Sequence, residues 1–126
     1  MKLLTHNMLS SRCIKGVSVG YPLKILAKNV KLINCDFDSE FTVRIIQKLD
    51  WNALWEAAES IGHIGDVPRN LSDVEEYEKN DEFLKKVHHI VLEVEVIEGE
   101  LECPETGRKF PIEDGVPNML LNEDEV

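Results

Sequence analysis

Residues 94–112 have the sequence VEVIEGELECPETGRKFPI, and this stretch decides the fold class. Apolar and polar residues alternate over 94–97 and again over 101–103, which is typical of strands with one buried face. Gly99 interrupts the alternation, and residues 104–107 supply turn chemistry before a last apolar stretch at 109–112. We therefore expect a β-hairpin with a knuckle-like turn and a break at Gly99.

The first 35 residues predict further strands. Residues 17–19, 23–25 and 30–33 combine β-branched residues or alternation with the punctuation of nearby glycines and a proline. No helical period is evident in this region. We expect short strands and turns here, paired with the C-terminal hairpin.

Residues 36–93 instead predict three helices. Apolar residues recur at three- and four-residue steps behind a candidate N-cap in each segment, and Gly62 is placed to end the second helix. The candidate N-caps are Asp38, Asp50, and Asn80 or Asp81. Trp51 and Trp55 lie on the apolar face of the second helix, so we expect both in the core. Residues 62–80 are rich in turn formers and acids and predict a surface loop.

These segments together predict an α+β protein in which both chain ends build a small sheet around a three-helix insertion. Residues 1–35 and 94–126 would form the β domain, and residues 36–93 the helical insertion. A chain of 126 residues has room for one compact core of this kind.

Charge and composition narrow the class of protein. The net charge of −10 is divided into +6 over residues 1–35 and −16 beyond them, and an acidic chain is a poor stand-alone binder of nucleic acid. The sequence has no apolar run long enough to span a membrane and no secretory signal pattern. Three widely spaced cysteines argue against a disulfide framework. We expect a protein of the cytoplasm and nucleus that does not bind membranes.

The sequence offers only fragments of catalytic sites. No glycine-rich loop follows a predicted strand, so neither a nucleotide site nor a methyl-donor site is indicated. His89 and Glu93 lie four apart on a helix, but two ligands are not a metal site, and a solvated helix face explains them better. Asp36 and Asp38 are better explained as the start of a helix than as cation ligands. We predict no catalytic residues.

Residues 103–107, CPETG, resemble half of a zinc knuckle. Cys103 and Gly107 match the pattern Cys-x-x-Cys-Gly, whereas Thr106 occupies the second ligand position. His6, Cys13 and Cys35 are the other candidate ligands, at spacings that do not match a ribbon. Zinc binding remains open on this pattern, beside the simpler interpretation that Cys103 packs as a small hydrophobe.

Three segments carry a resemblance to a known family: residues 1–11, MKLLTHNMLSS; residues 92–99, LEVEVIEG; and residues 115–121, GVPNMLL. Together with Phe41, Trp51 and the pair at 88–89, they resemble the multifunctional methyltransferase subunit, the tRNA methyltransferase 112 family, in its animal form. The resemblance spans nearly the whole chain.

The resemblance implies a zinc-ribbon-like β domain formed by both termini, with a helical domain inserted. It also implies a non-catalytic subunit that stabilises and activates several class I methyltransferases dependent on S-adenosylmethionine, bound one at a time as mutually exclusive heterodimers. Their substrates in the family are tRNA, small-subunit rRNA and a translation release factor. The partner holds the methyl donor and the catalytic residues, so this chain would bind no cofactor and would meet RNA only through its partner.

The resemblance also bears on the metal. Zinc-binding members of the family have cysteines at the positions of Ser11, Gly16, Cys103 and Thr106, and only Cys103 is present here. The resemblance therefore implies that the metal is absent and that apolar packing holds the ribbon.

We predict that the partner binds the sheet end made by the N-terminal segment and the C-terminal run. Pro117 has no N–H and suits an edge strand, where backbone pairing could serve several partners. The predicted partner-binding residues are Asn7, Met8, Phe110, Ile112, Val116, Pro117, Asn118, Met119 and Leu120. Two rival hypotheses are a small metal-dependent RNA-binding module and an enzyme with Cys103 as nucleophile.

Overall fold

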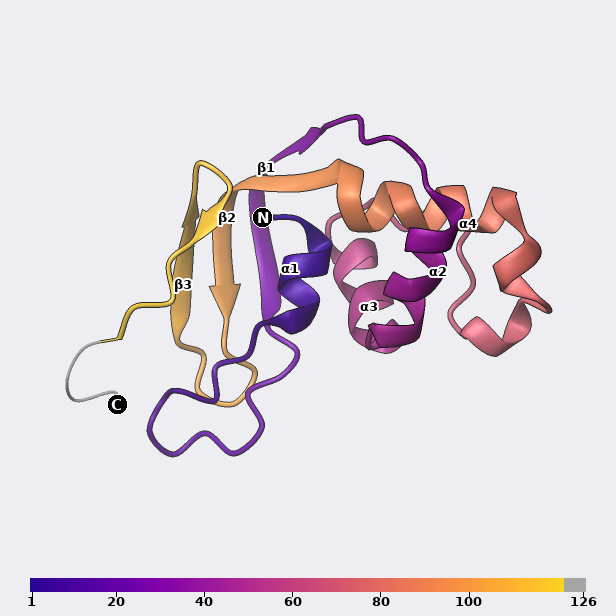
Figure 1. Cartoon of the computed structure of the whole chain (residues 1–126). Coiled ribbons are helices and arrows are strands. Elements are labelled where there is room, and N and C mark those ends of the chain that lie inside the picture. The colour runs from indigo at the N-terminus through magenta and orange to yellow at the C-terminus, as the bar shows by residue number, and fades with distance from the viewer. Residues whose placement is uncertain (122–126) are drawn as a thin grey trace.

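The computed structural model describes residues 1–121 and shows a mixed α+β protein in which a bent antiparallel sheet lies beside a group of helices (Figure 1). None of the helices within this range is long and apolar enough to cross a membrane. The elements in chain order are α1 (Leu3–Met8), β1 (Lys24–Leu32), α2 (Ser39–Lys48), α3 (Trp51–Ser60), the 3₁₀ turns η1 (Leu71–Asp73) and η2 (Tyr77–Lys79), α4 (Asp81–His88), the π-helical turn η3 (His89–Glu93), β2 (Val94–Glu102), β3 (Lys109–Glu113) and β4 (Val116–Pro117).

The predicted C-terminal hairpin is confirmed. β2 and β3 are antiparallel, with Leu101 opposite Phe110, and the turn is closed by hydrogen bonds from the N–H of Cys103 to the carbonyl of Arg108 and from the N–H of Gly107 to the carbonyl of Cys103. The strand order is β1-β2-β3-β4, so β1 and β4 are the two edges of the sheet.

The predicted break at Gly99 is wrong, because β2 runs through this residue without interruption. Gly99 pairs with Ala27 of β1 next to a bulge, and a Cβ at position 99 would lie 2.4 Å from the carbonyl oxygen of Leu26. The glycine therefore permits a close approach of two strands rather than ending one.

The strand predictions for the first 35 residues are partly wrong. A single strand, β1, covers most of 23–33, whereas residues 3–8 form a helix and residues 17–19 form no strand. No side chain caps α1; it is held by packing, since the side chains of Leu3 and His6 are almost completely buried. The backbone N–H groups of Ser18 and Val19 donate to the carboxylate of Glu105 instead of to a neighbouring strand.

The three predicted helices are confirmed together with their caps. The side chains of Asp38, Asp50 and Asn80 each accept a hydrogen bond at 3.1 Å from the backbone N–H three residues later. Gly62 follows α3 with φ of +78°, a left-handed conformation that suits glycine after a helix.

Trp51 and Trp55 lie at the rim of the core rather than within it. Both are partly exposed, and their indole N–H groups donate to the carbonyls of Arg69 and Val67 at 3.0 Å. They therefore fasten the loop at 62–80, which carries η1 and η2, to the face of α3.

One cluster of buried hydrophobic residues joins the sheet to the helices, including Leu3, Leu54, Leu84, Val96 and Phe110. α4 passes through the π turn directly into β2, and a contact of 3.0 Å between His89 Nδ1 and Glu93 Oε1 spans that turn. Figure 1 shows β1 on the side of the sheet nearer α2–α4 and the C-terminal segment on the other side.

Candidate protein-binding surface

β4 forms the outer edge of the sheet beyond β3. Pro117 lies opposite Ile112 and Val116 opposite Glu113, and the N–H of Asn118 donates to the carbonyl of Pro111 at 2.9 Å. Polar backbone groups alternate in direction along a strand. The bond from Asn118 therefore shows which backbone groups of this segment face β3. The carbonyl of Pro117 then points away from β3, toward the open side of the sheet.

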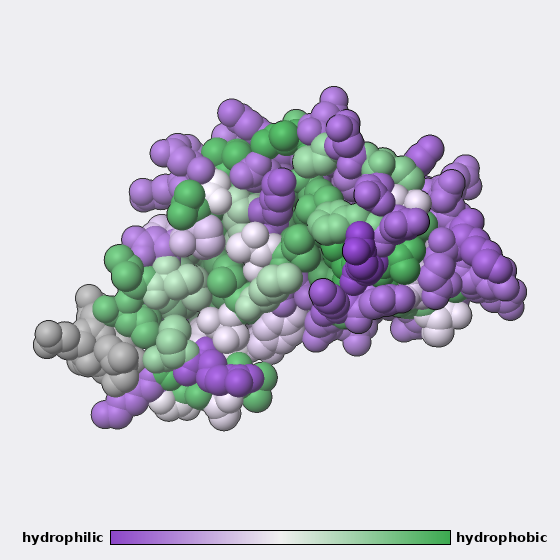
Figure 2. All heavy atoms as spheres, in the orientation of Figure 1, coloured by the Kyte–Doolittle hydropathy of each residue, from purple (hydrophilic) through white to green (hydrophobic). Residues whose placement is uncertain are grey.

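Apolar side chains surround this edge. Val116 is 64% exposed and Leu120 79% exposed, and with Met119 they line a hollow of about 550 Å³. Figure 2 shows hydrophobic residues, in green, gathered at the end of the molecule where the yellow C-terminal segment lies in Figure 1. Exposed apolar groups beside a free strand edge are typical of a protein-binding surface.

The structure brings together part of the predicted partner-binding set. The five residues at 116–120 form the continuous segment just described, with Met119 partly buried against the core. The side chains of Phe110 and Ile112 lie inside the core of the free chain, with exposed fractions of 0% and 2%. Both lie on β3, which pairs with β4, and their side chains are not surface groups.

Asn7 and Met8 lie on α1, away from β4. The Asn7 side chain is buried and pairs twice with the backbone of Asp50, donating to its carbonyl at 2.9 Å and accepting from its N–H at 3.0 Å. It therefore ties α1 to the start of α3. Met8 is 72% exposed and remains available for contact with another molecule.

Three of the four positions at which the resemblance implied zinc ligands, Ser11, Cys103 and Thr106, meet around one sulfur atom. Cys103 Sγ lies 2.9 Å from Ser11 Oγ and accepts from the N–H of Thr106 at 3.4 Å. Burial raises the pKa of the Cys103 thiol, but the hydrogen bonds from Ser11, Thr106 and Glu105 outweigh it and hold that pKa below its usual value.

Gly16, the fourth of these positions, does not join the group around the Cys103 sulfur. It lies in the exposed loop after Ser11, and a Cβ there would have no atom within 4 Å. Within residues 1–121, no three His, Cys, Asp or Glu side chains are grouped closely enough to hold a metal ion. The absence of zinc from the purified protein stays a prediction.

Glu105 provides a second link between the loop that follows α1 and the turn between β2 and β3. The sequence analysis did not predict this link. Its carboxylate accepts hydrogen bonds from the N–H of Ser18 at 3.2 Å, of Val19 at 2.9 Å and of Gly20 at 2.6 Å. These donors hold the pKa of Glu105 below its usual value. The expectation that apolar packing holds the ribbon is therefore incomplete, because hydrogen bonds also join the loops.

Cys103 does not have the surroundings of a catalytic nucleophile. Its exposed fraction is 1%, and within residues 1–121 its sulfur accepts from the Ser11 hydroxyl and the Thr106 N–H rather than from a base. The arrangement is suited to structure.

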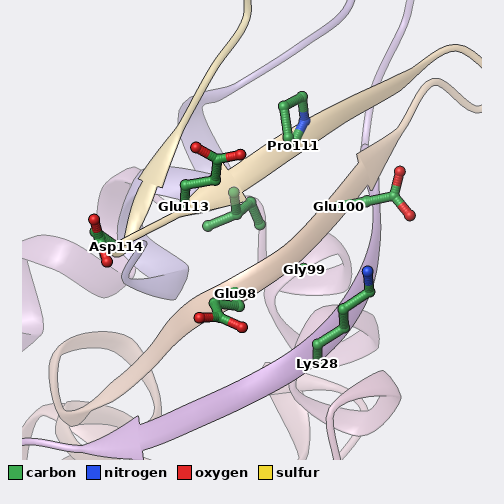
Figure 3. Close-up of a pocket in the computed structure, with 8 residues that line it drawn as sticks. Lys28, Glu98, Gly99, Glu100, Pro111, Glu113 and Asp114 are labelled. Carbon is green, nitrogen blue, oxygen red and sulfur yellow. The ribbon is translucent and has the colours of Figure 1, made fainter.

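One hollow on the outer face of the sheet is lined mainly by acidic residues. Glu98, Glu100, Glu113 and Asp114 line a hollow of about 540 Å³ together with Lys28, and Figure 3 shows these side chains on the ribbon of β1, β2 and β3 and the turn after β3. Carboxylates on this face repel phosphate groups. This hollow is therefore unsuited to direct contact with RNA.

Comparisons with known proteins agree on one family. The family model described as Trm112p-like protein matches residues 2–115. The chain is 50% identical over 126 residues to the multifunctional methyltransferase subunit TRM112-like protein of Bos taurus, covering 99% of this chain and 98% of that protein. It is 49% identical to the TRM112 homolog A of Arabidopsis thaliana, with complete coverage of both chains.

A solved structure has the same fold. A chain in the E. cuniculi Mtq2-Trm112 complex, described as responsible for methylation of the eRF1 translation termination factor, aligns with a TM-score of 0.55 over 95% of both chains. The sequence identity is 16%, so this likeness supports the fold alone.

Proposed function

Because the chain belongs to the Trm112p-like family of multifunctional methyltransferase subunits, we propose that it binds and activates several methyltransferases and does no chemistry itself. Each partner supplies the pocket for S-adenosylmethionine and the catalytic residues. The proposed substrates of the complexes are tRNA, small-subunit rRNA and a translation release factor. The chain would act in the cytoplasm and nucleus, where these substrates are made and used.

The free edge of β4 is the single observation that carries this proposal. The carbonyl of Pro117 points outward from this edge, so a strand of a methyltransferase sheet can pair alongside β4. Main-chain hydrogen bonds do not depend on the partner's side chains, which explains how one surface serves several enzymes. Because each enzyme would use the same edge, the heterodimers would be mutually exclusive.

Val116 and Leu120 would supply the apolar contacts around this pairing. Their exposure in the free chain means that they can be buried by a partner at a gain of about 25 cal/mol per Å². Met119 and Met8 add flexible side chains that adapt to different apolar contours. We propose that the β part, residues 1–35 and 94–126, makes the main contact and that residues 36–93 form a separate helical part.

A lysine at position 120 tests the surface without disturbing the core, since Leu120 is the most exposed of the large apolar residues. Co-expression of Leu120→Lys with a methyltransferase that co-purifies with the natural chain should lower recovery of the complex at least about tenfold, a loss of ~1.4 kcal/mol or more in binding. The matched control is Leu32→Lys, which alters an exposed leucine at 61% exposure on β1, the opposite edge.

Two outcomes decide the matter. Loss of the complex for Leu120→Lys alone, with both variants folded by circular dichroism, supports the β4 surface. Equal recovery of both variants would place the interface elsewhere. Mutual exclusion is tested by adding a second methyltransferase to the preformed complex and measuring displacement of the first.

The acidic hollow on the sheet argues against the rival function, a metal-dependent RNA-binding module. Glu98, Glu100, Glu113 and Asp114 outnumber the single lysine beside them. A salt titration of RNA binding by the isolated chain should show only weak association.

A further inference from the structure

The α-amino group of Met1 is held inside the protein. Met1 is 3% exposed, and its nitrogen donates to the carbonyl of Val96 at 2.7 Å and to the carbonyl of Gly115. The carboxylate of Glu95 lies 3.7 Å from the same nitrogen. Burial lowers the pKa of this amine, and the charge of Glu95 partly offsets the effect. The terminal amine is therefore a structural group.

Backbone pairing with β2 places this amine. Met1 and Val96 form an antiparallel pair, since the Val96 N–H also donates to the Met1 carbonyl at 2.8 Å. Lys2 forms an antiparallel bridge with Glu95. The side chain of Leu3, the next residue, is fully buried. These contacts fix the position of the nitrogen to the register of β2.

The same amine holds the turn that leads into β4 (Figure 1). Gly115 accepts from Met1 through its carbonyl, and its N–H donates to the carbonyl of Ile97 at 2.9 Å. A Cβ at Gly115 would lie 2.9 Å from Glu95 Oε1 and 3.3 Å from the Met1 nitrogen. Val116, the first residue of β4, follows directly. The carbonyl held by the amine is therefore bonded to the first residue of the proposed partner-binding edge.

Acetylation would remove what this contact requires. The uncharged amine attacks the carbonyl carbon of an acetyl thioester, a C–N bond forms, the C–S bond breaks, and the thiol leaves with the proton released by nitrogen. The product is a neutral amide with a single N–H, whereas the carbonyls of Val96 and Gly115 both accept from the free amine. The added acetyl group would also enter a space in which a Cβ at Gly115 already meets its neighbours. An acetylated terminus cannot make the same contacts.

We propose that the Met1 amine is an acetylation-sensitive anchor: unmodified, it holds Gly115 and the start of β4 for methyltransferase binding, and an acetyl group added during synthesis releases them and weakens binding. Because the amine is buried once the chain has folded, an acetyltransferase reaches it only on the unfolded chain. The modification would set the binding strength of each molecule when it is made. This inference rests on the proposed use of β4 as the partner-binding edge.

Chemical labelling of the natural chain tests the burial of the amine. Near pH ~7 an exposed α-amino group reacts with acetic anhydride before lysine does, because its pKa is lower. In the folded chain exposed lysines such as Lys15 should instead react at least about tenfold faster than Met1, since labelling a buried amine needs local opening. The ordinary order should return in denaturant. Mass spectrometry of peptides measures both rates.

Binding is compared between the natural chain and a chain acetylated at Met1 by co-expression with an N-terminal acetyltransferase. The affinity for a co-purifying methyltransferase should fall at least about tenfold, with both chains folded by circular dichroism. Gly115→Ala should also weaken binding, because its Cβ disturbs the anchor from the other side. The matched control is Gly107→Ala, which has the same φ of +77° but open space around the added Cβ. It should bind more tightly than Gly115→Ala.

Amide hydrogen exchange supplies a readout that needs no methyltransferase. Acetylation should speed exchange of the Gly115 amide and leave that of Cys103, at the other end of the sheet, unchanged. Labelling of Met1 before lysine in the folded chain, or a Gly115 amide unaffected by acetylation, would overturn the anchor. Unchanged affinity of the acetylated chain would overturn its link to binding. The Leu120→Lys test then shows separately whether the proposed surface has failed as well.

Discussion

Replacement of Ser11 by alanine tests the contact between Ser11 and Cys103 that joins the loop after α1 to the turn between β2 and β3. Ser11 Oγ lies 2.9 Å from Cys103 Sγ and 3.3 Å from the carbonyl oxygen of Gly20. Ser11 Oγ donates in both contacts, so its one hydroxyl hydrogen is shared between the Cys103 sulfur and the Gly20 carbonyl. Ser11→Ala removes both bonds from a site with no exposure to solvent.

The expected loss follows from the number of bonds. A buried hydrogen bond contributes about 0.5–1.5 kcal/mol, and Gly20 keeps its bond of 2.8 Å from the Ser11 N–H, so we expect a total loss of about 1–2 kcal/mol. An unfolding entropy of roughly 2.1 cal/mol/K per residue over 126 residues converts this loss into a decrease in Tm of about 4–8 °C.

The loss of unfolding free energy and the decrease in Tm can be measured by urea unfolding and calorimetry. The variants needed are Ser11→Ala, Cys103→Ala and the double variant. The coupling free energy between the two positions should be about 1 kcal/mol, because either single change leaves the other group without its partner. Ser10→Ala serves as control, since it changes a half-buried serine next in sequence. Purely additive effects, or a Tm of Ser11→Ala equal to that of the control, would refute the reasoning.

Three further predictions concern the same end of the molecule. The lowered pKa of Glu105 means that its carboxylate stabilises the fold above the pKa of an unfolded glutamate and that this stabilisation is lost as the pH falls through the lower folded value. Thermal melts of the natural chain and Glu105→Gln should therefore differ near pH ~7 and converge near pH ~3, and a constant difference would contradict this. The purified protein should contain no stoichiometric zinc by elemental analysis; one equivalent per chain with unfolding by a chelator would show that a metal site persists. Reversing the charges of Arg12 and Lys15 should weaken binding of RNA substrate by a methyltransferase complex at low salt while the two proteins stay associated, and unchanged affinity would mean that these side chains are only solvated.

The parts of the fold that depend on local chemistry were predictable. Asp38, Asp50 and Asn80 cap their helices through bonds that span three residues, so the signal and the structure lie within one segment. The hairpin turn at 103–108 follows equally from its proline and glycine.

Features that depend on distant contacts were not predictable. α1 has no side-chain cap, and it forms because Leu3 and His6 are buried against segments far along the chain. Gly99 has the pattern of a strand break but is required by the approach of Leu26 across the sheet. Glu105 carries no sequence signal, since its partners at 18–20 lie more than eighty residues away.

The candidate protein-binding surface was likewise predictable only in part. The edge role of Pro117 follows from its missing N–H and could be predicted from sequence. The burial of Phe110 and Ile112 could not, because an apolar strand residue points to the core or to solvent according to the register of the sheet.

The π turn between α4 and β2 has a consequence for how chains of this kind can vary in length. Helix and strand meet here without a loop, so a residue deleted from His89–Glu93 cannot be absorbed locally. The deletion would rotate β2 by one position and turn Val94 and Val96, both fully buried, toward solvent. Natural insertions and deletions should therefore avoid this junction and accumulate at 62–80, where 3₁₀ turns and surface positions leave room for a longer or shorter chain.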